Sequence, residues 1–483
     1  MNKVIDEEFS KKMLDALNMH KLKTVSVCVK SFPDESRKNI FNLAGDIDTF
    51  KFKKGLVKNN LKKYIYDFSN YLRSEDDFYI FTGAELESLG LVLYPYLSFG
   101  ILNGGFATSY VDLIKNNNFN KELYLLYEDK ILEAKESFES LPKGITPAYI
   151  NKNGSYGFSF LALKIRHLLM LSKRCADLYG KIIKPSIFQM TSFSTNEIIS
   201  NFLDGIFVED VIKNLNYCGL KKEDILTAVQ PLVYCYRKLS DGQYEYFTYK
   251  KDNKKNILAL PAGHGQNFRV LRDIYFKLYE SGKRFVYIGN VDNIGFTVNL
   301  KALAVMAITN SSSGFEFSVK TALDMKGGVL VIDEDDDLTC VDIGGAISKE
   351  AVIKAECRGD KILFNCATGL FDLEYLIMNI DRIISEIPVR MIEQDKEIGK
   401  YTAIEQITWE VLKIVDNPLI FRVNRGDRFL PAKLFIEMLI TSNYLNDKFL
   451  GDSTQIADYL NKSLNKLLQN DYGLVSKGGN WGV

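Results

Sequence analysis

Polar and small residues follow a short apolar run early in this sequence, and their types suit the binding of an anionic ligand. Asn103, Gly104 and Gly105 come directly after the run Leu97–Leu102. Paired glycines let the backbone approach a ligand closely, and successive exposed amides can cradle a phosphate or a base edge. The same pair is also typical of an ordinary strand-to-helix turn. Leu102 to Gly105 is therefore a candidate nucleotide loop whose interpretation depends on later segments.

A hard metal ion is the expected cofactor. Asn290 and Asp292 follow the run Arg284–Gly289. An aspartate at the end of a parallel strand can hold Mg²⁺ against phosphates, although it can also cap the next helix. The three histidines are far apart and the seven cysteines form no CxxC pair, which argues against a zinc site. We expect Asp292 to be a ligand of Mg²⁺.

Three further segments place polar residues beside apolar runs. Gly263 and His264 follow Leu258–Pro261, Lys320 begins a lysine- and glycine-containing stretch, and Lys433 ends the segment Arg428-Phe429-Leu430-Pro431-Ala432-Lys433. Taken singly, each is also consistent with a solvated turn or a surface charge.

The composition excludes some classes of protein. The chain has 483 residues, of which 46% are apolar and 25% charged, as in globular proteins. Lysine plus arginine and aspartate plus glutamate both total 61, so no net charge favours nucleic acid or anionic lipid. No apolar run is long enough to cross a bilayer, and we expect a cytoplasmic protein without a membrane or nucleic-acid partner.

The elements that must position these residues alternate between strand-like and helix-like patterns from about Leu91 to Val389, which predicts a doubly wound α/β sheet. Helical periodicity is expected before this stretch, over Asp6 to about Ser74, and again after Pro431. We predict a helical N-terminal region (1–93), a catalytic domain (94–433) and a helical C-terminal region (434–483). The expected strands are Leu97–Leu102, Ser186–Thr191, Leu232–Tyr236, Arg284–Gly289, Ala304–Thr309, Val329–Ile332, Thr339–Ile343 and Ile362–Asn365. Ligands of such sheets bind at the carboxyl ends of the strands.

The segments resemble, in the same order, the motifs of the eukaryotic-type UDP-glucose pyrophosphorylases and their UDP-sugar relatives. The family motif LNGGLGTSMG is similar to Leu102–Ser109, the family's Pro-Lys pair to Pro142–Gly144, and its MxSFxT to Met190–Thr195. Its GHGD is similar to Gly263–Gln266 and its NxDNxG to Asn290–Gly295. Its KTxxDxKGG is similar to Lys320–Gly328 and its RFLPVK to Arg428–Lys433. The resemblance spans about Leu97 to Lys433. It implies a mixed sheet in a Rossmann-like, GT-A-like nucleotidyltransferase core.

The resemblance also implies a role for each matching residue. The uracil and ribose of UTP would contact Asn103, Gly104, Gly105 and Gln230. The phosphates would face Lys143 and Lys433, which are the predicted catalytic residues. Gly263 and His264 would lie between nucleotide and sugar, and Asn290 and Asp292 would reach the sugar, the α-phosphate and the metal. Leu102, Lys320 and Asn365 complete the predicted substrate-binding set.

The implied activity is UTP-dependent uridylyl transfer to glucose 1-phosphate, which yields UDP-glucose and pyrophosphate. The sequence departs from the family at several positions. Ala107 and Val111 stand in place of glycines, and Gln266 stands in place of an acidic residue. The segment Asn365–Gly369 falls where the family has the asparagine-rich FNTNN, in which Asn365 matches and Thr368 does not. Family enzymes of the glucose type commonly end in a β-helical domain, whereas this chain has helical patterns there.

Alternatives remain open from the sequence. A uridylyltransferase for N-acetylglucosamine 1-phosphate commonly has a loop closer to LAGGQGTRLG, and Asn103 and Ser109 differ from it. A non-catalytic UDP-sugar-binding protein would tolerate the departures, but it has little need of two phosphate-facing lysines. A dinucleotide oxidoreductase is disfavoured because no GxGxxG follows an early strand. The oligomeric state and the breadth of sugar acceptance are left open.

Overall fold

The computed structural model describes residues 4–22, 27–34, 36–45, 49–64, 73–180, 182–251, 254–396, 398–442, 444 and 454–483. Within these ranges, no helix combines the length and the apolar character that a bilayer crossing requires.

A mixed sheet of 11 strands forms the centre of the described chain, with the order β2-β22-β16-β19-β15-β6-β7-β8 and with β1, β17 and β18 attached beside β19. Its strands are β1 (Val29–Ser31), β2 (Ile40–Asn42), β6 (Leu97–Leu102), β7 (Ser186–Ser192), β8 (Ile225–Gln230), β15 (Phe285–Asn290), β16 (Ser313–Val319), β17 (Gly328–Asp333), β18 (Leu338–Asp342), β19 (Leu363–Asp372) and β22 (Leu419–Val423). Strands β15, β6, β7 and β8 are parallel, whereas β19 runs antiparallel to β15.

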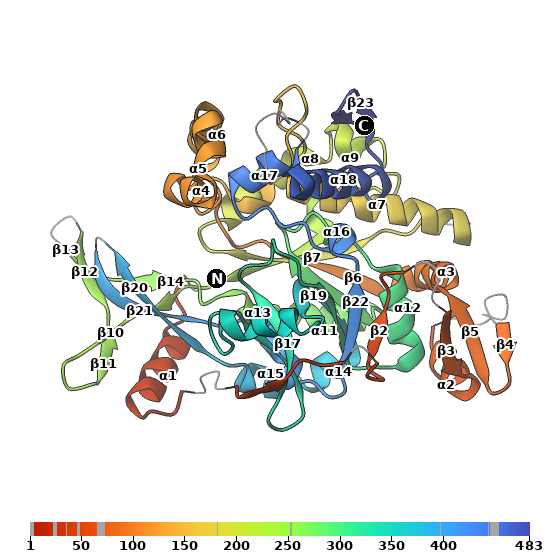
Figure 1. Cartoon of the computed structure of the whole chain (residues 1–483), viewed down its shortest axis with the longest axis horizontal. Coiled ribbons are helices and arrows are strands. Elements are labelled where there is room, and N and C mark those ends of the chain that lie inside the picture. The colour runs from red at the N-terminus through yellow and green to blue at the C-terminus, as the bar shows by residue number, and fades with distance from the viewer. Residues whose placement is uncertain are drawn as a thin grey trace.

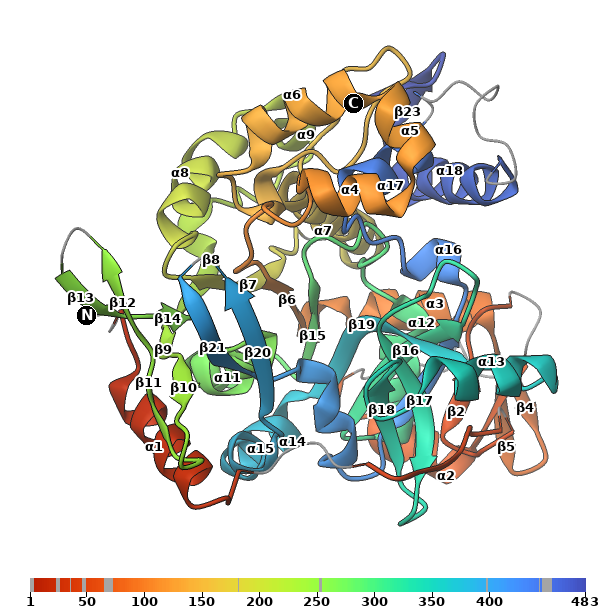
Figure 2. The same cartoon turned by 60° about the vertical axis from the view of Figure 1, so that its left-hand side comes forward.

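Helices cover both faces of this sheet (Figures 1 and 2). The alternation of side chains along β15 shows why, since Phe285 and Tyr287 enter one apolar core and Val286 and Ile288 enter the other. One face packs against α3 (Gly83–Leu93), α7 (Phe160–Tyr179) and α12 (Leu300–Thr309). The other packs against α11 (Arg272–Glu280), α14 (Leu373–Met378) and α15 (Ile380–Glu386).

Smaller elements surround this three-layer centre. The further helices are α1 (Glu7–Asn18), α2 (Lys54–Leu61), α4 (Leu113–Phe119), α5 (Lys121–Leu126), α6 (Glu128–Phe138), α8 (Asn196–Ile206), α9 (Asp210–Lys213), α10 (Asn267–Val270), α13 (Lys349–Cys357), α16 (Arg425–Arg428), α17 (Phe435–Thr441) and α18 (Thr454–Asn470). The further strands are β3 (Thr49–Lys53), β4 (Arg73–Glu75), β5 (Phe78–Thr82), β9 (Val233–Tyr234), β10 (Tyr236–Lys238), β11 (Tyr244–Tyr246), β12 (Thr248–Lys251), β13 (Lys254–Ile257), β14 (Ala259–Leu260), β20 (Arg390–Lys396), β21 (Gly399–Glu405), β23 (Val475–Lys477) and β24 (Asn480–Gly482).

The predicted α/β fold class is confirmed, because a mixed sheet forms the centre and helices also occur near both ends of the chain. The helical pattern expected over Asp6–Ser74 corresponds to α1 and α2, but the same stretch also forms β1, β2 and β3. The run Leu232–Tyr236 is divided between β9 and β10. The region boundaries at residues 93 and 433 stay predictions.

The strand predicted over Ala304–Thr309 is wrong, because these residues form the end of α12. The helix is apolar on all sides and buried from Ala302 to Ile308, so the sequence has no periodicity to distinguish a helix from a buried strand. The helix begins after Asn299, whose side chain accepts a hydrogen bond from the amide of Ala302, and ends at Asn310 in the left-handed conformation.

A buried ion pair joins the centre of the sheet to the segment after β22. The guanidinium of Arg428 donates to Glu316 Oε1 at 3.0 Å, to Tyr287 Oη at 2.8 Å and to Thr297 Oγ1 at 2.7 Å. Thr368 donates to the second carboxylate oxygen of Glu316 at 2.9 Å. Arg428 therefore fixes the beginning of the segment that leads to Lys433.

Glu316→Gln should destabilise the fold strongly, because it leaves a buried guanidinium without its counter-ion. Removal of one partner from a buried pair commonly costs about 3–5 kcal/mol in free energy of unfolding. Urea unfolding of the wild type and the variant measures this cost. The matched control is Glu75→Gln, which breaks the exposed Lys51–Glu75 pair and should cost less than about 1 kcal/mol. Equal losses for the two variants would contradict this role for Arg428.

Candidate active site

The loop after β6 lies against a second segment that contains Lys143. The amide of Lys143 donates to the carbonyl of Gly105 at 2.8 Å, and Phe106 forms a β-bridge with Pro142. A Cβ at Gly144 would lie 2.2 Å from Asn103 Oδ1, so only glycine fits beside that amide. The structure thus brings the predicted nucleotide loop and the predicted phosphate-facing lysine together.

Asn103 occupies a buried position at the start of this loop. Its backbone amide donates to Met190 O at 2.9 Å, and its side-chain Nδ2 donates to Gln189 Oε1 at 3.2 Å. Its Oδ1 has no hydrogen-bond partner among the described residues and is buried against Gly144. Buried acceptors are nearly always satisfied, so this unpaired oxygen is an exception within the loop.

Lys143 is a buried cation without a counter-ion in contact. Its Nζ lies 3.2 Å from the centre of the Tyr110 ring and has no hydrogen-bond partner in the described part of the chain. Burial lowers the pKa of Lys143 to about 7, while the charges of Asp292 and Glu437 oppose this shift. A site that holds an unpaired lysine in this way is suited to an anion.

Asp292 stands at the end of β15, next to the nucleotide loop. Strand β15 pairs in parallel with β6, so that Asn290 lies opposite Leu102, and the amide of Val291 donates to Leu102 O at 3.2 Å. Asp292 is half-buried, and among the described residues its carboxylate has no hydrogen bond or ion pair. Both acidic and polar groups predicted from the sequence therefore gather at the carboxyl ends of neighbouring strands.

The segment that ends in Lys433 is attached to the Asp292 loop through Asn293. Asn293 Nδ2 donates to Arg428 O at 2.9 Å, and its Oδ1 accepts from the amide of Leu430 at 2.9 Å. The amide of Ala432 donates to the backbone carbonyl of Asp292 at 3.2 Å. These bonds set the position of Lys433 relative to Asp292.

Glu437 lies close to both predicted phosphate-facing lysines. Burial raises the pKa of Glu437, whereas a hydrogen bond from the Leu434 amide and the charges of Lys433 and Lys143 lower it. Lys433 itself is exposed, and it lines a pocket of about 590 Å³ together with Lys326 and Met325. The two lysines therefore share one acidic neighbour.

Gln230, Gly263 and His264 form a separate group at the end of β8. Gln230 Nε2 donates to Gly263 O at 2.8 Å. Gly263 has a φ of 80°, and a Cβ there would lie 2.5 Å from Gln406 O. His264 Nδ1 lies 2.8 Å from Thr408 Oγ1, and burial lowers the pKa of His264 to about 4. The imidazole is therefore neutral at pH 7 and cannot offset phosphate charge.

Lys320 and Asn365 are occupied by neighbours of their own. Lys320 Nζ forms an ion pair with Glu356 at 3.0 Å. Asn365 is buried, and its Oδ1 accepts from the amide of Ala367 at 2.8 Å. The structure gives both residues local structural contacts, so their predicted substrate contacts stay predictions.

Three of the residues that depart from the family pattern are buried in the structure. Ala107 and Val111, which replace glycines, are fully buried in the apolar core beneath the loop. Gln266 is buried and accepts hydrogen bonds from Arg269, the shorter at 2.7 Å. Packing of the loop onto the core thus replaces the flexibility that glycines would give.

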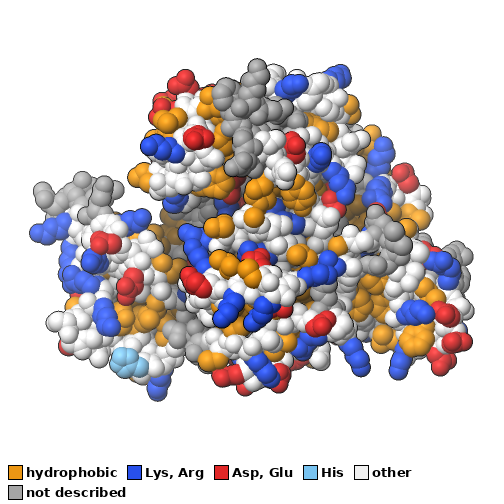
Figure 3. Space-filling model, in the orientation of Figure 1, with side chains coloured by type: hydrophobic (Ala, Val, Ile, Leu, Met, Phe, Trp, Pro, Cys, Tyr) orange, Lys and Arg blue, Asp and Glu red, His pale blue; other side chains and the backbone are white. Residues whose placement is uncertain are grey.

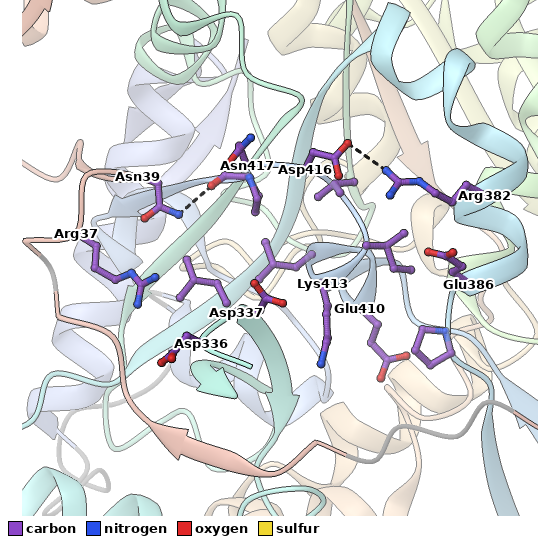
Figure 4. Close-up of a pocket in the computed structure, with 16 residues that line it drawn as sticks. Arg37, Asn39, Asp336, Asp337, Arg382, Glu386, Glu410, Lys413, Asp416 and Asn417 are labelled. Atoms are coloured by element: carbon purple, nitrogen blue, oxygen red, sulfur yellow. Dashed lines mark hydrogen bonds and ion pairs between the residues drawn. The ribbon is translucent and has the colours of Figure 1, made fainter. Parts of the chain in front are cut away.

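Surface shape and charge agree with this location. Figure 3 shows the surface hollowed between α17 and α18 at the top of the view and the body of the sheet below, with lysine and arginine side chains along the hollow. A different pocket of about 700 Å³ lies before the start of β22 and contains none of the predicted site residues (Figure 4). Two of its lining residues, Arg382 and Asp416, form an ion pair at 3.3 Å.

Sequence reasoning missed Tyr110 and Glu437. Tyr110 lies seven residues after Asn103, and no motif assigns its ring to the ammonium of Lys143. Glu437 lies in the first turn of α17, whereas Lys433 precedes that helix, so no helical spacing in the sequence joins the two.

Comparison with known proteins identifies the family. The sequence profile of the UTP–glucose-1-phosphate uridylyltransferase family matches residues 152–456. The chain belongs to this family. The nucleotide loop and Lys143 precede the matched range.

Two related proteins are similar to this chain over part of their length. A probable UTP–glucose-1-phosphate uridylyltransferase of Schizosaccharomyces pombe is 38% identical over 201 residues, which are 39% of this chain and 33% of that protein. The UTP–glucose-1-phosphate uridylyltransferase of Musa acuminata is 24% identical over 302 residues, 60% of this chain and 57% of that protein. The matches thus span from about a third to under three-fifths of these two family members.

Solved structures share the fold. The uridine diphosphate N-acetylglucosamine pyrophosphorylase of Trypanosoma brucei, in complex with an inhibitor, has a TM-score of 0.57 at 15% identity over 96% of this chain and 87% of that one. A G45Y mutant of UDP-glucose pyrophosphorylase from Leishmania major, in complex with UDP-glucose, has a TM-score of 0.53 at 17% identity over 73% of this chain and 66% of that one.

The buried Lys143 should destabilise the ligand-free protein in a pH-dependent way. The pKa of Lys143 is about 7 in the folded chain, against about 10.4 when unfolded, so between these values the unfolded state binds more protons and stability rises with pH. Lys143→Met should therefore be more stable than the wild type by up to about 4 kcal/mol at pH 6, and this difference should shrink towards pH 10.

The measurement is the difference in free energy of unfolding between wild type and Lys143→Met at pH 6, 8 and 9.5, which cancels the other titrating groups. A variant that is less stable at pH 6, or a difference that does not change with pH, would contradict the assignment of Lys143 as an unpaired buried cation.

Proposed function

We propose that this protein is a UTP–glucose-1-phosphate uridylyltransferase, which converts UTP and glucose 1-phosphate to UDP-glucose and pyrophosphate. The observation that carries the proposal is the buried, unpartnered ammonium of Lys143 beside the loop of Asn103 to Gly105 and near Asp292. Family membership supports it, as do the names of the related proteins.

The proposed reaction needs placement and charge neutralisation. An oxygen of the sugar phosphate attacks the α-phosphorus of UTP, a new P–O bond forms, and the bond from the α-phosphorus to the bridging oxygen breaks with its electrons on pyrophosphate. The attacking oxygen is already ionised at neutral pH, so no general base is required. The protein must hold two anions together against their repulsion.

The residues of the chain are suited to that task. Lys143 would face the phosphates from inside the protein, and Lys433 would face them from the exposed side. Phosphate oxygens would give Lys143 the hydrogen-bond partners that its ammonium lacks in the ligand-free protein. The uracil of UTP would lie against the backbone of the loop from Asn103 to Gly105, whose amides can meet a base edge.

Asp292 fits a divalent cation, because its half-buried carboxylate is free and lies near the lysines. No cluster of three or more acidic, histidine or cysteine side chains is found in the described ranges, so phosphate oxygens and water would supply most of the ligands. When bound, Mg²⁺ would neutralise charge on the phosphates.

Pyrophosphate release tests the proposal directly. The protein is incubated with Mg²⁺, UTP and either glucose 1-phosphate, N-acetylglucosamine 1-phosphate or galactose 1-phosphate, and then with ATP in place of UTP. We expect release with UTP and glucose 1-phosphate, and a slower rate with ATP because a purine would not match the polar groups of a site that binds uracil. A faster rate with the N-acetylated sugar would assign the protein to that substrate. Tight UDP-glucose binding without any release would mean a non-catalytic binding protein.

The two lysines distinguish catalysis from binding. Lys143→Ala and Lys433→Ala should each reduce the rate by about 10²–10³-fold, because they stabilise charge that develops on the leaving pyrophosphate. Affinity for UDP-glucose, measured by calorimetry, should fall less for Lys433→Ala. Lys400→Ala removes an exposed lysine from β21 and should leave both quantities unchanged. Normal turnover by Lys433→Ala would remove that residue from the site.

A further inference from the structure

A buried lysine on α7, Lys164, donates hydrogen bonds to the loop that carries Asp292. Lys164 Nζ donates to Asn293 O at 2.6 Å, to Ile294 O at 3.3 Å and to Tyr472 Oη at 3.1 Å. Lys164 is 1% exposed. Its Nζ thus makes three hydrogen bonds, and two of them end on the carbonyls that directly follow Asp292.

Tyr472, which follows α18, completes this contact. Its hydroxyl donates to Ile294 O, the same carbonyl that accepts from Lys164. The side chain of Tyr472 is fully buried. The backbone of Tyr472 is held in turn, because Arg166 Nε donates to Tyr472 O at 2.5 Å.

The neighbours of these two residues reach the far end of the same loop. His167, three residues after Lys164 and so on the same face of α7, accepts from the amide of Val298 at 3.0 Å through Nε2. Its Nδ1 donates to Asp471 O at 2.8 Å. Thr297 Oγ1 donates to Asp471 Oδ1 at 3.1 Å. We call Lys164, His167, Asp471 and Tyr472 the C-terminal brace.

The brace and the side chain of Asn293 both hold the backbone that follows Asp292. The side chain of Asn293 binds Arg428 O and the amide of Leu430. The carbonyls of Asn293 and Ile294 are held by Lys164 and Tyr472. The backbone that carries Asp292 is thus fixed while its carboxylate is left without a protein partner, and preorganised ligands bind metals and phosphates more tightly.

We propose that Lys164 and Tyr472 are positioning residues that fix the Asp292 carboxylate for the divalent cation and the phosphates, so that the segment after α18 is a functional part of the site. This inference rests on the proposed function in giving Asp292 a metal. It concerns one residue about 40 positions beyond Lys433 and one near the start of α7, both outside every motif that the sequence showed.

Mn²⁺ titration followed by electron paramagnetic resonance, in the presence of UTP, measures the affinity of the site for the cation without turnover. Tyr472→Phe removes one hydroxyl and keeps the ring, and it should weaken Mn²⁺ binding by about 10-fold, as loss of a residue behind a metal ligand commonly does. Lys164→Gln should act in the same direction and serves as a second variant. The matched control is Tyr94→Phe, which removes a buried hydroxyl that donates to Leu168 O of the same helix at 2.9 Å.

The outcomes separate positioning from general stability. Weaker Mn²⁺ binding by Tyr472→Phe with unchanged binding by Tyr94→Phe, at similar losses of Tm, supports the proposal. Unchanged binding by both brace variants, equal weakening by Tyr94→Phe, or a wild type that binds no Mn²⁺ with UTP overturns it. A wild type that binds Mn²⁺ with UTP yet releases no pyrophosphate overturns the proposed function alone.

Discussion

The burial of Arg428 against Glu316 is the constraint on which the candidate site depends. A guanidinium in the apolar centre of a sheet is tolerable only where every N–H finds an acceptor, and here Glu316, Tyr287 and Thr297 supply acceptors from β16, β15 and the loop after β15. Because this geometry is fixed, the carbonyl of Arg428 is available to Asn293. This hydrogen bond between Asn293 and Arg428 helps to fix the segment that leads from Arg428 to Lys433.

Lys143 shows the opposite arrangement, in which a charge is buried without a partner. Its ammonium lies on the ring of Tyr110, which is weakly attractive and cannot replace the water that burial removes. The burial of this charge lowers the free energy of unfolding of the ligand-free protein, and an anion that binds beside Lys143 removes this cost. A carboxylate of the protein in contact with Lys143 would raise the stability of the fold, but it would compete with the phosphates for the lysine.

Much of the sheet could be predicted from the sequence, since β6, β7, β15, β17 and β18 are short apolar runs between turn signals. Helix α12 could not, because a segment buried on all sides has no pattern of period 3.6. Motif order predicted that Asn103, Lys143, Asp292 and Lys433 belong to one region. It could not predict Tyr110, Glu437, Lys164 or Tyr472, because their roles depend on contacts between distant segments and on burial, which no spacing in the sequence records.

The central claim is that the unpaired, buried amino group of Lys143 is a binding group for a phosphate of UTP. Proton uptake on the binding of UTP tests this claim most directly. The pKa of Lys143 is about 7 in the ligand-free protein, so at pH 8 the group is mostly neutral, and nearby phosphates would raise its pKa and protonate it. Calorimetry of UTP binding with Mg²⁺ at pH 8, in buffers of different ionisation enthalpy, should give an uptake of nearly one proton for the wild type and none for Lys143→Met. Equal uptake by the two proteins, or none by the wild type, would contradict the account.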